Sequence, residues 1–175
     1  MNLLIIGHAR HGKDTVCNLL VEMTPLTFTG SSLLATDLGI FDDIIKAYIK
    51  VDVPSIRMAR QKFYENKGMF RQEMYEAIRA FNAEDKTRLA KEIYKQADIY
   101  CGLRDKEEFD AIKRANLTDL IIWVDASLRL EKEPKTSMKL DRTCADIIIE
   151  NNGSKAELKD KVERLAVILT DKVKE

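Results

Sequence analysis

The chain has 175 residues, of which 45% are hydrophobic and 33% charged, as is ordinary for a soluble globular protein long enough to bury a full core. Its 29 basic residues balance 29 acidic ones, which excludes a global electrostatic attraction to nucleic acid or anionic membranes. No stretch approaches the roughly 20 apolar residues of a membrane-spanning helix, and the first apolar run is too short for a signal peptide. The 3 cysteines form no CxxC pair, so we expect a reducing, cytoplasmic setting.

The chain opens with an apolar run over 2–6 that predicts a buried strand, because so short a run ends at a glycine. From Lys13 onward, apolar residues recur at helical spacing, as Val16, Leu19, Leu20 and Met23. The residues between these two segments, over 7–15, read GHARHGKDT. They nearly satisfy the phosphate-binding pattern G-x-x-x-x-G-K-[ST], which joins a strand to a helix.

This loop has the features that binding of a polyphosphate requires. Gly7 and Gly12 permit a close backbone approach that a β-carbon would block, and successive amides form an anion-binding nest before the helix. Lys13 is expected to contact the β- and γ-phosphates. Asp14 stands where a serine or threonine usually ligates Mg²⁺, and Thr15 follows, so both are candidate metal ligands. The residues expected to bind the nucleotide here are Gly7, Ala9, Arg10, His11, Gly12, Lys13, Asp14 and Thr15. The two histidines fill variable positions and need no catalytic role.

The remaining elements alternate between strands and helices. In chain order, we expect a strand over 27–29, a helix from Ser31 or Ser32 through Ile45, one or two helices over 52–85 starting at Pro54 and broken at Gly68, a helix over 86–96, a strand over 97–102, a helix over 105–115, strands over 119–125 and 146–149, and a closing helix. This order predicts a three-layer α/β/α fold with a mainly parallel, five-stranded sheet. Ligands bind beyond the carboxyl ends of such strands. The residues at those ends are Gly7, Gly102, Asp125 and Asn151.

We expect one domain over 1–175, with a helical insertion over 31–85 and a short lid over 126–142. The lid segment is polar and carries Arg129, Lys132, Lys135, Lys139 and Arg142. Such a segment can close over a nucleotide and exclude water. Arg142 is the candidate for reaching the γ-phosphate, because it lies nearest the last strand. Arg104 follows an apolar strand, and its planar guanidinium suits two phosphate oxygens, the alternative being an ion pair with Glu107 or Glu108.

Three segments carry a resemblance to a known family. The loop G-x-x-x-x-G-K-D-T resembles that of phage deoxynucleoside monophosphate kinases and animal-type phosphomevalonate kinases, within the P-loop family of nucleoside monophosphate kinases. The segment YCGLRDKEE resembles the S-D-x-R-x-x-x-E element of that group, with Arg104 and Glu108 in place and Gly102 where an aspartate is usual. The segment DIIIENNGS is similar to the last strand and adenine-side loop of dephospho-coenzyme A kinases and phage nucleotide kinases.

The resemblance implies a P-loop kinase that uses ATP and Mg²⁺, with Asn152 and Gly153 on the adenine side. It also implies that the helical insertion binds the acceptor, for which the candidates are Ser31, Ser32, Arg57, Arg60 and Arg71. Phosphoryl transfer depends mainly on positioning and charge neutralisation. The candidate catalytic residues are therefore Lys13, Arg104 and Arg142. Asp42 joins them as the base that a hydroxyl acceptor would need, whereas a phosphate acceptor is already ionised.

Two deoxynucleotide-type acceptors remain open. One is a free deoxynucleoside monophosphate. The other is 5-hydroxymethyluracil in DNA, because GHARHGKDT with YCGLR is also similar to phage kinases that phosphorylate this base. Basic and aromatic residues over 57–75 favour DNA, but the zero net charge opposes it. A nucleotide-binding protein without activity is a further alternative. A GTPase is disfavoured, since ENNG stands in place of N-K-x-D. We expect no membrane partner, and the sequence allows a homodimer.

Overall fold

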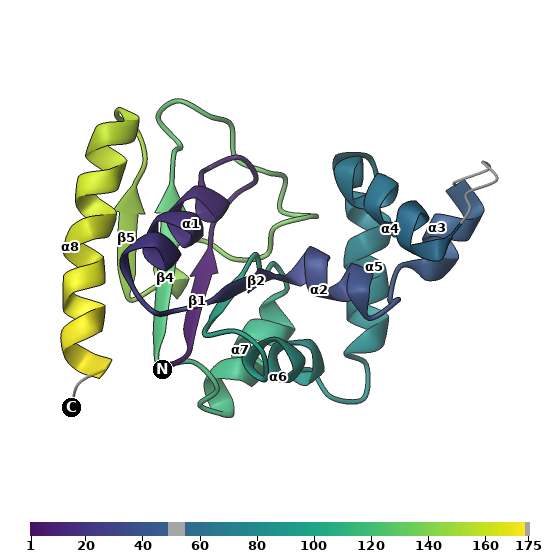
Figure 1. The fold of residues 1–175 in the computed structure, drawn as a ribbon. Coiled ribbons are helices and arrows are strands. Elements are labelled where there is room, and N and C mark those ends of the chain that lie inside the picture. The colour runs from purple at the N-terminus through teal and green to yellow at the C-terminus, as the bar shows by residue number, and fades with distance from the viewer. Residues whose placement is uncertain (49–54, 174–175) are drawn as a thin grey trace.

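The computed structural model describes residues 1–48 and 55–173, and its centre is a parallel sheet with strand order β2-β3-β1-β4-β5 (Figure 1). The strands are β1 (Leu3–Ile6), β2 (Phe28–Gly30), β3 (Ile99–Cys101), β4 (Leu120–Asp125) and β5 (Ile147–Glu150). Every pairing between them is parallel. The predicted three-layer α/β fold is therefore confirmed.

The central strand β1 is apolar throughout because neighbours cover both its edges and both its faces. Leu3 is in register with Ile99 on one side and with Leu120 on the other. Its side chains alternate between the two faces, and all of them are fully buried. A parallel strand inside such a sheet needs a continuous apolar run rather than alternation, which is the pattern over 2–6.

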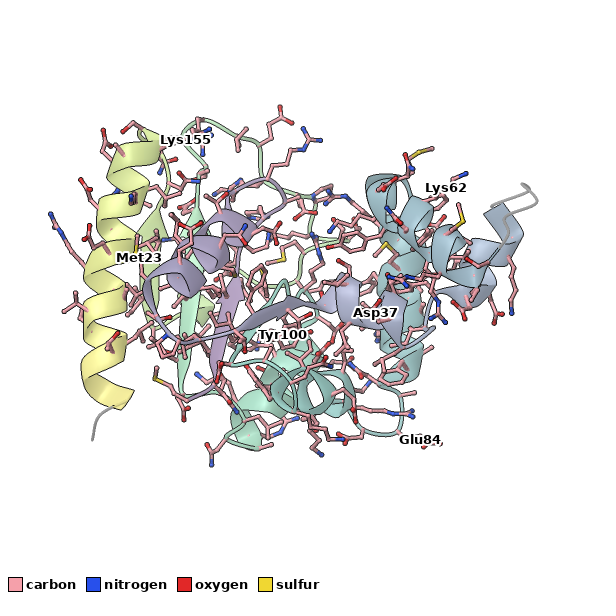
Figure 2. All side chains as sticks on the ribbon, viewed as in Figure 1. Met23, Asp37, Lys62, Glu84, Tyr100 and Lys155 are labelled. Carbon is pink, nitrogen blue, oxygen red and sulfur yellow. The ribbon has the colours of Figure 1, made fainter. Side chains whose placement is uncertain are left out.

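Helices cover both faces of the sheet. On one face, α1 (Lys13–Met23) and α8 (Lys155–Val173) pack over the side chains of Leu3 and Ile5. On the other face, α6 (Arg88–Tyr94) and α7 (Lys106–Arg114) pack over Leu4 and Ile6. Tyr100 belongs to this second layer and is 1% exposed; Figure 2 shows its place near the middle of the molecule. Among the described residues, no helix combines the length and apolarity that crossing a bilayer demands.

The helical insertion follows β2 and lies beside the sheet (Figure 1). It consists of α2 (Ser31–Asp37), α3 (Asp42–Tyr48), α4 (Ile56–Glu65), the short 3-10 helix η1 (Lys67–Met69) and α5 (Arg71–Phe81). It has an apolar cluster of its own, in which the rings of Phe63 and Phe70 stack at 5.0 Å. The predicted break at Gly68 is confirmed, because η1 separates α4 from α5 there. The predicted start at Pro54 lies outside the described residues.

The prediction of one helix from Ser31 through Ile45 is wrong. The chain leaves α2 at Gly39, whose φ of +76° is a left-handed conformation that favours glycine, and α3 then begins at Asp42. A β-carbon at Gly39 would also lie 2.7 Å from Nη2 of Arg60. The apolar periodicity continues across this turn, so the pattern alone did not reveal the break.

The segment over 126–142 runs from the end of β4 across the top of the sheet toward α4 and α5 (Figure 1). It contains neither helix nor strand until the short 3-10 helix η2 (Arg142–Cys144). Met138 and Leu140 are buried in the same apolar layer as Tyr100. These two side chains fix the return of the segment to the sheet, and the stretch before them crosses the carboxyl ends of the strands.

Candidate functional site

The connection from β1 to α1 is a tight loop that requires both of its glycines. Gly7 has φ +144°, and a β-carbon there would lie 2.5 Å from the Val124 carbonyl oxygen. Gly12 has φ +98°, and a β-carbon there would lie 2.4 Å from Nδ2 of Asn151. The loop therefore presses directly against β4 and the residue that follows β5. Its geometry agrees with the anion-binding nest expected from the sequence.

Lys13 begins α1 and lies within the curve of this loop. Its side chain reaches back so that Nζ donates to the His8 carbonyl at 2.8 Å, and the residue is 9% exposed. Burial, the largest influence, lowers the pKa of Lys13, and Arg104 lowers it further. An ammonium group held this far from water gains strongly from an anionic partner. A phosphate within the loop would be such a partner.

Buried polar side chains tie the loop to the rest of the sheet. Nδ2 of Asn151 donates to the His11 carbonyl at 2.9 Å. The His11 ring is completely buried, and its Nδ1 accepts from the Ala126 amide at 3.0 Å. Its Nε2 therefore carries the proton and donates to the Glu131 carbonyl at 3.3 Å. The His11 ring therefore contacts the segment over 126–142, and only the backbone of His11 faces into the loop as the predicted nucleotide-binding residue.

His8 has a matching role. Its Nδ1 accepts from the Glu133 amide at 3.1 Å, and its ring meets that of Trp123 edge to face at 5.4 Å. Burial lowers the pKa of His8 and of His11, so the neutral rings that can accept these hydrogen bonds are favoured. Sequence reasoning missed this function, because the partners are backbone amides more than 100 residues away.

A cavity of about 340 Å³ opens beside the loop, on the side of β3 and β2. Loop residues Arg10, Lys13 and Asp14 form one wall, and Ser31, Ser32, Gly102 and Arg104 line it at the strand ends. The opposite wall comes from α5, through Arg71, Met74, Tyr75, Ile78 and Arg79. The structure thus brings together the loop lysine, the predicted arginine after β3 and three of the predicted acceptor residues. These three are Ser31, Ser32 and Arg71.

Four other predicted residues lie elsewhere and do not line the cavity. Asp42 and Arg60 form a two-pronged ion pair at 2.8 and 2.7 Å that joins α3 to α4. The hydrogen bond from Arg60 lowers the pKa of Asp42. Arg57 is exposed on α4. The Arg142 side chain is 54% exposed and its Nη1 lies 3.7 Å from Asp125. Asp42 is thus engaged by Arg60 away from the cavity, and neither Arg57, Arg60 nor Arg142 is placed to contact a ligand in it.

The predicted adenine-side residues lie across the loop from the cavity. Asn152 and Gly153 follow β5, which is the edge strand on the side opposite to β2. Oδ1 of Asn152 accepts from the Leu128 amide at 3.1 Å. The loop after the central strand is therefore flanked by the cavity on one side and by the residues that follow β5 on the other.

One carboxylate joins the segment over 126–142 to the two cavity arginines. Oε1 of Glu133 lies 2.6 Å from Nη1 of Arg71 and 2.6 Å from Nη1 of Arg104. Its Oε2 accepts from the Ala9 amide of the phosphate loop, also at 2.6 Å. Burial opposes ionisation of this carboxyl, but both arginines and the Ala9 amide outweigh it and lower the pKa of Glu133. Arg104 thus pairs with Glu133, not with Glu107 or Glu108. The sequence offered no periodic signal for this long-range contact.

The inner wall of the cavity carries polar groups that keep their protons. Burial raises the pKa of Glu108 to about 8, although hydrogen bonds from Tyr100 and Asn82 oppose the shift. The Tyr100 hydroxyl donates to Glu108 at 2.9 Å. The Tyr75 hydroxyl donates to Asp105 at 2.5 Å, and burial together with this carboxylate raises the pKa of Tyr75 to about 12. Neutral donors and acceptors beside apolar surface suit the polar edge of a planar ring.

Of the two predicted magnesium ligands, Asp14 lines the cavity and Thr15 does not. Asp14 is exposed at the cavity wall, and its Oδ1 accepts a weak hydrogen bond from the Cys101 thiol at 3.6 Å. The described parts of the chain contain no cluster of three or more metal-ligating side chains. Mg²⁺ bound with a nucleotide needs no such cluster, because it uses one or two carboxylates together with phosphates and waters.

No protein-family profile matches the chain, and no curated protein matches it either. Among solved structures, it is similar to shikimate kinase from Acinetobacter baumannii in complex with shikimate, with 16% identity, a TM-score of 0.50, and coverage of 98% of this chain and 94% of that one. An unliganded sugar kinase from Janibacter matches with 13% identity, a TM-score of 0.47, and coverage of 97% and 94%. Shikimate kinase from Aquifex aeolicus matches with 17% identity, a TM-score of 0.43, and coverage of 95% and 96%. The first of these matches, together with the parallel sheet and its order, shows that the chain shares the fold of that shikimate kinase.

Proposed function

We propose that this protein is a kinase that transfers the γ-phosphate of ATP to a deoxynucleotide-type acceptor, in the manner of the phage deoxynucleoside monophosphate kinases that its loop resembles. The observation that carries the proposal is a single cavity lined both by Lys13 of the phosphate loop and by Arg104 and Arg71. Donor and acceptor phosphates can meet only where their two sites share one space. This cavity provides that space.

The chain's own residues supply positioning and charge. Loop amides and Lys13 hold the β- and γ-phosphates, and Lys13 follows the charge as it moves to the acceptor. Arg71 and Arg104 hold an acceptor oxyanion from the other side of the cavity, where a guanidinium can bind two oxygens. Asp14 would hold Mg²⁺, which when bound neutralises charge on the phosphates. No proton transfer is required, because a phosphate acceptor is already ionised.

The cavity walls favour a nucleotide acceptor. Met74, Ile78 and Tyr75 of α5 give apolar and aromatic surface for a ring, and the neutral carboxyl of Glu108 lies on the same cavity. A volume of about 340 Å³ is in the range of sites that enclose a small ligand. The two arginines would then hold the monophosphate while the base packs against α5.

The rival acceptor, 5-hydroxymethyluracil in DNA, would need a base for its hydroxyl. The residue predicted for that role, Asp42, is engaged by Arg60 outside the cavity. The deciding experiment offers γ-labelled ATP and two separate acceptor pools, free deoxynucleoside monophosphates and DNA that contains 5-hydroxymethyluracil. The proposal expects label in the monophosphates. Label in DNA alone would assign the rival acceptor, and label in neither pool would contradict kinase activity toward deoxynucleotides.

Lys13→Met separates catalysis from nucleotide binding without transfer. We expect transfer to fall by about a hundredfold or more, because an ammonium that stabilises the transferring phosphate contributes electrostatically in the transition state. Lys159→Met is the matched control, since Lys159 is exposed on α8 and does not line the cavity. Wild-type protein that binds MgATP but transfers nothing would instead support the non-catalytic alternative.

A further inference from the structure

The carboxylate of Glu133 is held as a bound phosphate would be. Its two oxygens receive the Arg71 and Arg104 guanidinium groups and the Ala9 amide, each at 2.6 Å. Two guanidinium groups and a loop amide are the donors that proteins use for phosphoryl and carboxylate oxyanions. The Glu133 side chain is 10% exposed, so its position is enclosed rather than an incidental surface contact.

The backbone around Glu133 is anchored on both sides of this contact. The Glu133 amide donates to Nδ1 of His8 at 3.1 Å. Farther along the segment, Nη1 of Arg104 donates to the Ser137 carbonyl at 3.3 Å, and the Arg104 carbonyl accepts from the Lys139 amide at 3.0 Å. The segment that crosses the strand ends therefore delivers one acidic side chain to the mouth of the cavity and holds it there.

We propose that Arg71, Arg104 and the Ala9 amide form an oxyanion-binding site for a phosphoryl group, and that Glu133 fills this site as an internal competitor until a ligand's phosphoryl oxygens displace it. The inference rests on the proposed function in one respect, that a phosphorylated ligand enters this cavity. Beyond that function, the inference assigns a role to Glu133 of the segment over 126–142. It also describes a closed state in which the Glu133 carboxylate occupies the oxyanion site. Opening of the segment and arrival of the phosphoryl group are then a single exchange of anions.

The exchange has a measurable consequence. A ligand binds only those molecules in which Glu133 has left the site. Its apparent affinity is therefore the intrinsic affinity multiplied by the fraction of molecules with an open site. Glu133→Gln keeps the size of the side chain but removes the charge that attracts the arginines. We therefore expect inorganic phosphate or pyrophosphate to bind the variant about tenfold or more tightly than the wild type. Glu131→Gln removes the same charge two residues earlier, from an exposed side chain, and should change affinity less than twofold.

The experiment measures phosphate and pyrophosphate affinity by calorimetry for the full-length wild type, Glu133→Gln and Glu131→Gln. A gain confined to Glu133→Gln supports the proposal, and adding Arg71→Gln to that variant should abolish the gain. Equal affinity in Glu133→Gln and Glu131→Gln would overturn it. Further titrations use thymidine monophosphate, and a non-hydrolysable ATP analogue compared with ADP. They show whether the gain in affinity of Glu133→Gln over the wild type belongs to the acceptor phosphate or to the γ-phosphate. A gain with either ligand supports the site, and a gain with neither overturns it.

A second measurement uses the unaltered protein. Lys135 is already exposed, but its backbone is held while Glu133 is bound, so displacing Glu133 should free this backbone and inorganic phosphate should accelerate tryptic cleavage after Lys135. Unchanged or slower cleavage would count against the exchange. Both results are separate from catalysis. Tighter phosphate binding by Glu133→Gln in a protein that labels no acceptor would leave the oxyanion site in place while the proposed function fails.

Discussion

Gly12→Ala tests whether the phosphate loop is held by the contact between its last glycine and Asn151. Gly12 has φ +98°, and a β-carbon there would lie 2.4 Å from Nδ2 of Asn151. That atom donates to the His11 carbonyl, so alanine both forces a left-handed backbone and breaks a buried hydrogen bond. The first effect costs about 1–2 kcal/mol and the second about 1–3 kcal/mol, so we expect a loss of about 2–5 kcal/mol in the free energy of unfolding.

The assay is urea unfolding followed by fluorescence of Trp123, the only tryptophan in the chain and 2% exposed. Gly68→Ala is the matched control, because no described atom lies within 4 Å of the β-carbon that it would add. Gly12→Ala should also bind ATP more weakly, since the loop must move to admit the methyl group. Melting temperature should fall by about 2–4 °C for each kcal/mol in a chain of this size.

Adding Asn151→Ala to Gly12→Ala separates the two effects. The double variant removes the clash but keeps the left-handed strain, so its loss should be smaller than the sum of the two single losses. Gly12→Ala that proves as stable as Gly68→Ala, with unaltered ATP affinity, would refute the reasoning about this contact.

Three further predictions follow from the ion pair and the buried titratable groups. Asp42→Asn removes the partner of Arg60, which lies between α3 and α4, so stability should fall by about 1 kcal/mol while transfer to a monophosphate stays within about threefold; a hundredfold loss of transfer would restore Asp42 as a base. Glu108 keeps its proton in the folded state up to a pKa of about 8, whereas the unfolded chain releases it near its ordinary value, so this group makes stability fall as pH rises from about 4.5 to 8. In urea unfolding from pH 5 to 8, the free energy of unfolding should therefore decline less for Glu108→Gln than for the wild type. Parallel declines in the two proteins would contradict the raised pKa of Glu108. His11→Ala leaves the Ala126 amide unpaired, so it should cost about 2–4 kcal/mol in unfolding experiments, and a loss below 0.5 kcal/mol would be inconsistent with that bond.

The fold could be predicted from the sequence because its strongest signals are local. The apolar run over 2–6 and the runs that become β3, β4 and β5 each end at a polar or glycine residue, and helical periodicity separates them. The loop between β1 and α1 depends on residues adjacent in the chain, so its pattern was sufficient to place Lys13 and both glycines. Gly39 shows the limit, because the apolar spacing is the same on both sides of its left-handed turn.

The candidate site was predicted less completely, because several of its contacts join distant segments. Glu133 meets Arg71 and Arg104 only after α5 and the segment over 126–142 fold against the strand ends. No periodic pattern marks a single acidic residue in an irregular stretch. Asp42 and Arg60 carried the charges expected at an acceptor site, but the packing of α3 on α4 pairs them with each other. The hydrogen bonds of the two histidine rings could not be predicted, because the sequence does not show which distant backbone amides lack a carbonyl partner.

The most direct test of the central claim is a crystal structure with a bisubstrate analogue in which adenosine and thymidine are joined through a polyphosphate. The account predicts phosphates wrapped by the amides of residues 9–15, Lys13 within hydrogen-bond distance of them, and thymine against Met74 and Tyr75. Glu133 should have left Arg71 and Arg104, with a phosphate between them instead. An analogue bound away from this loop, or one that leaves the cavity beside α5 unfilled, would contradict the account.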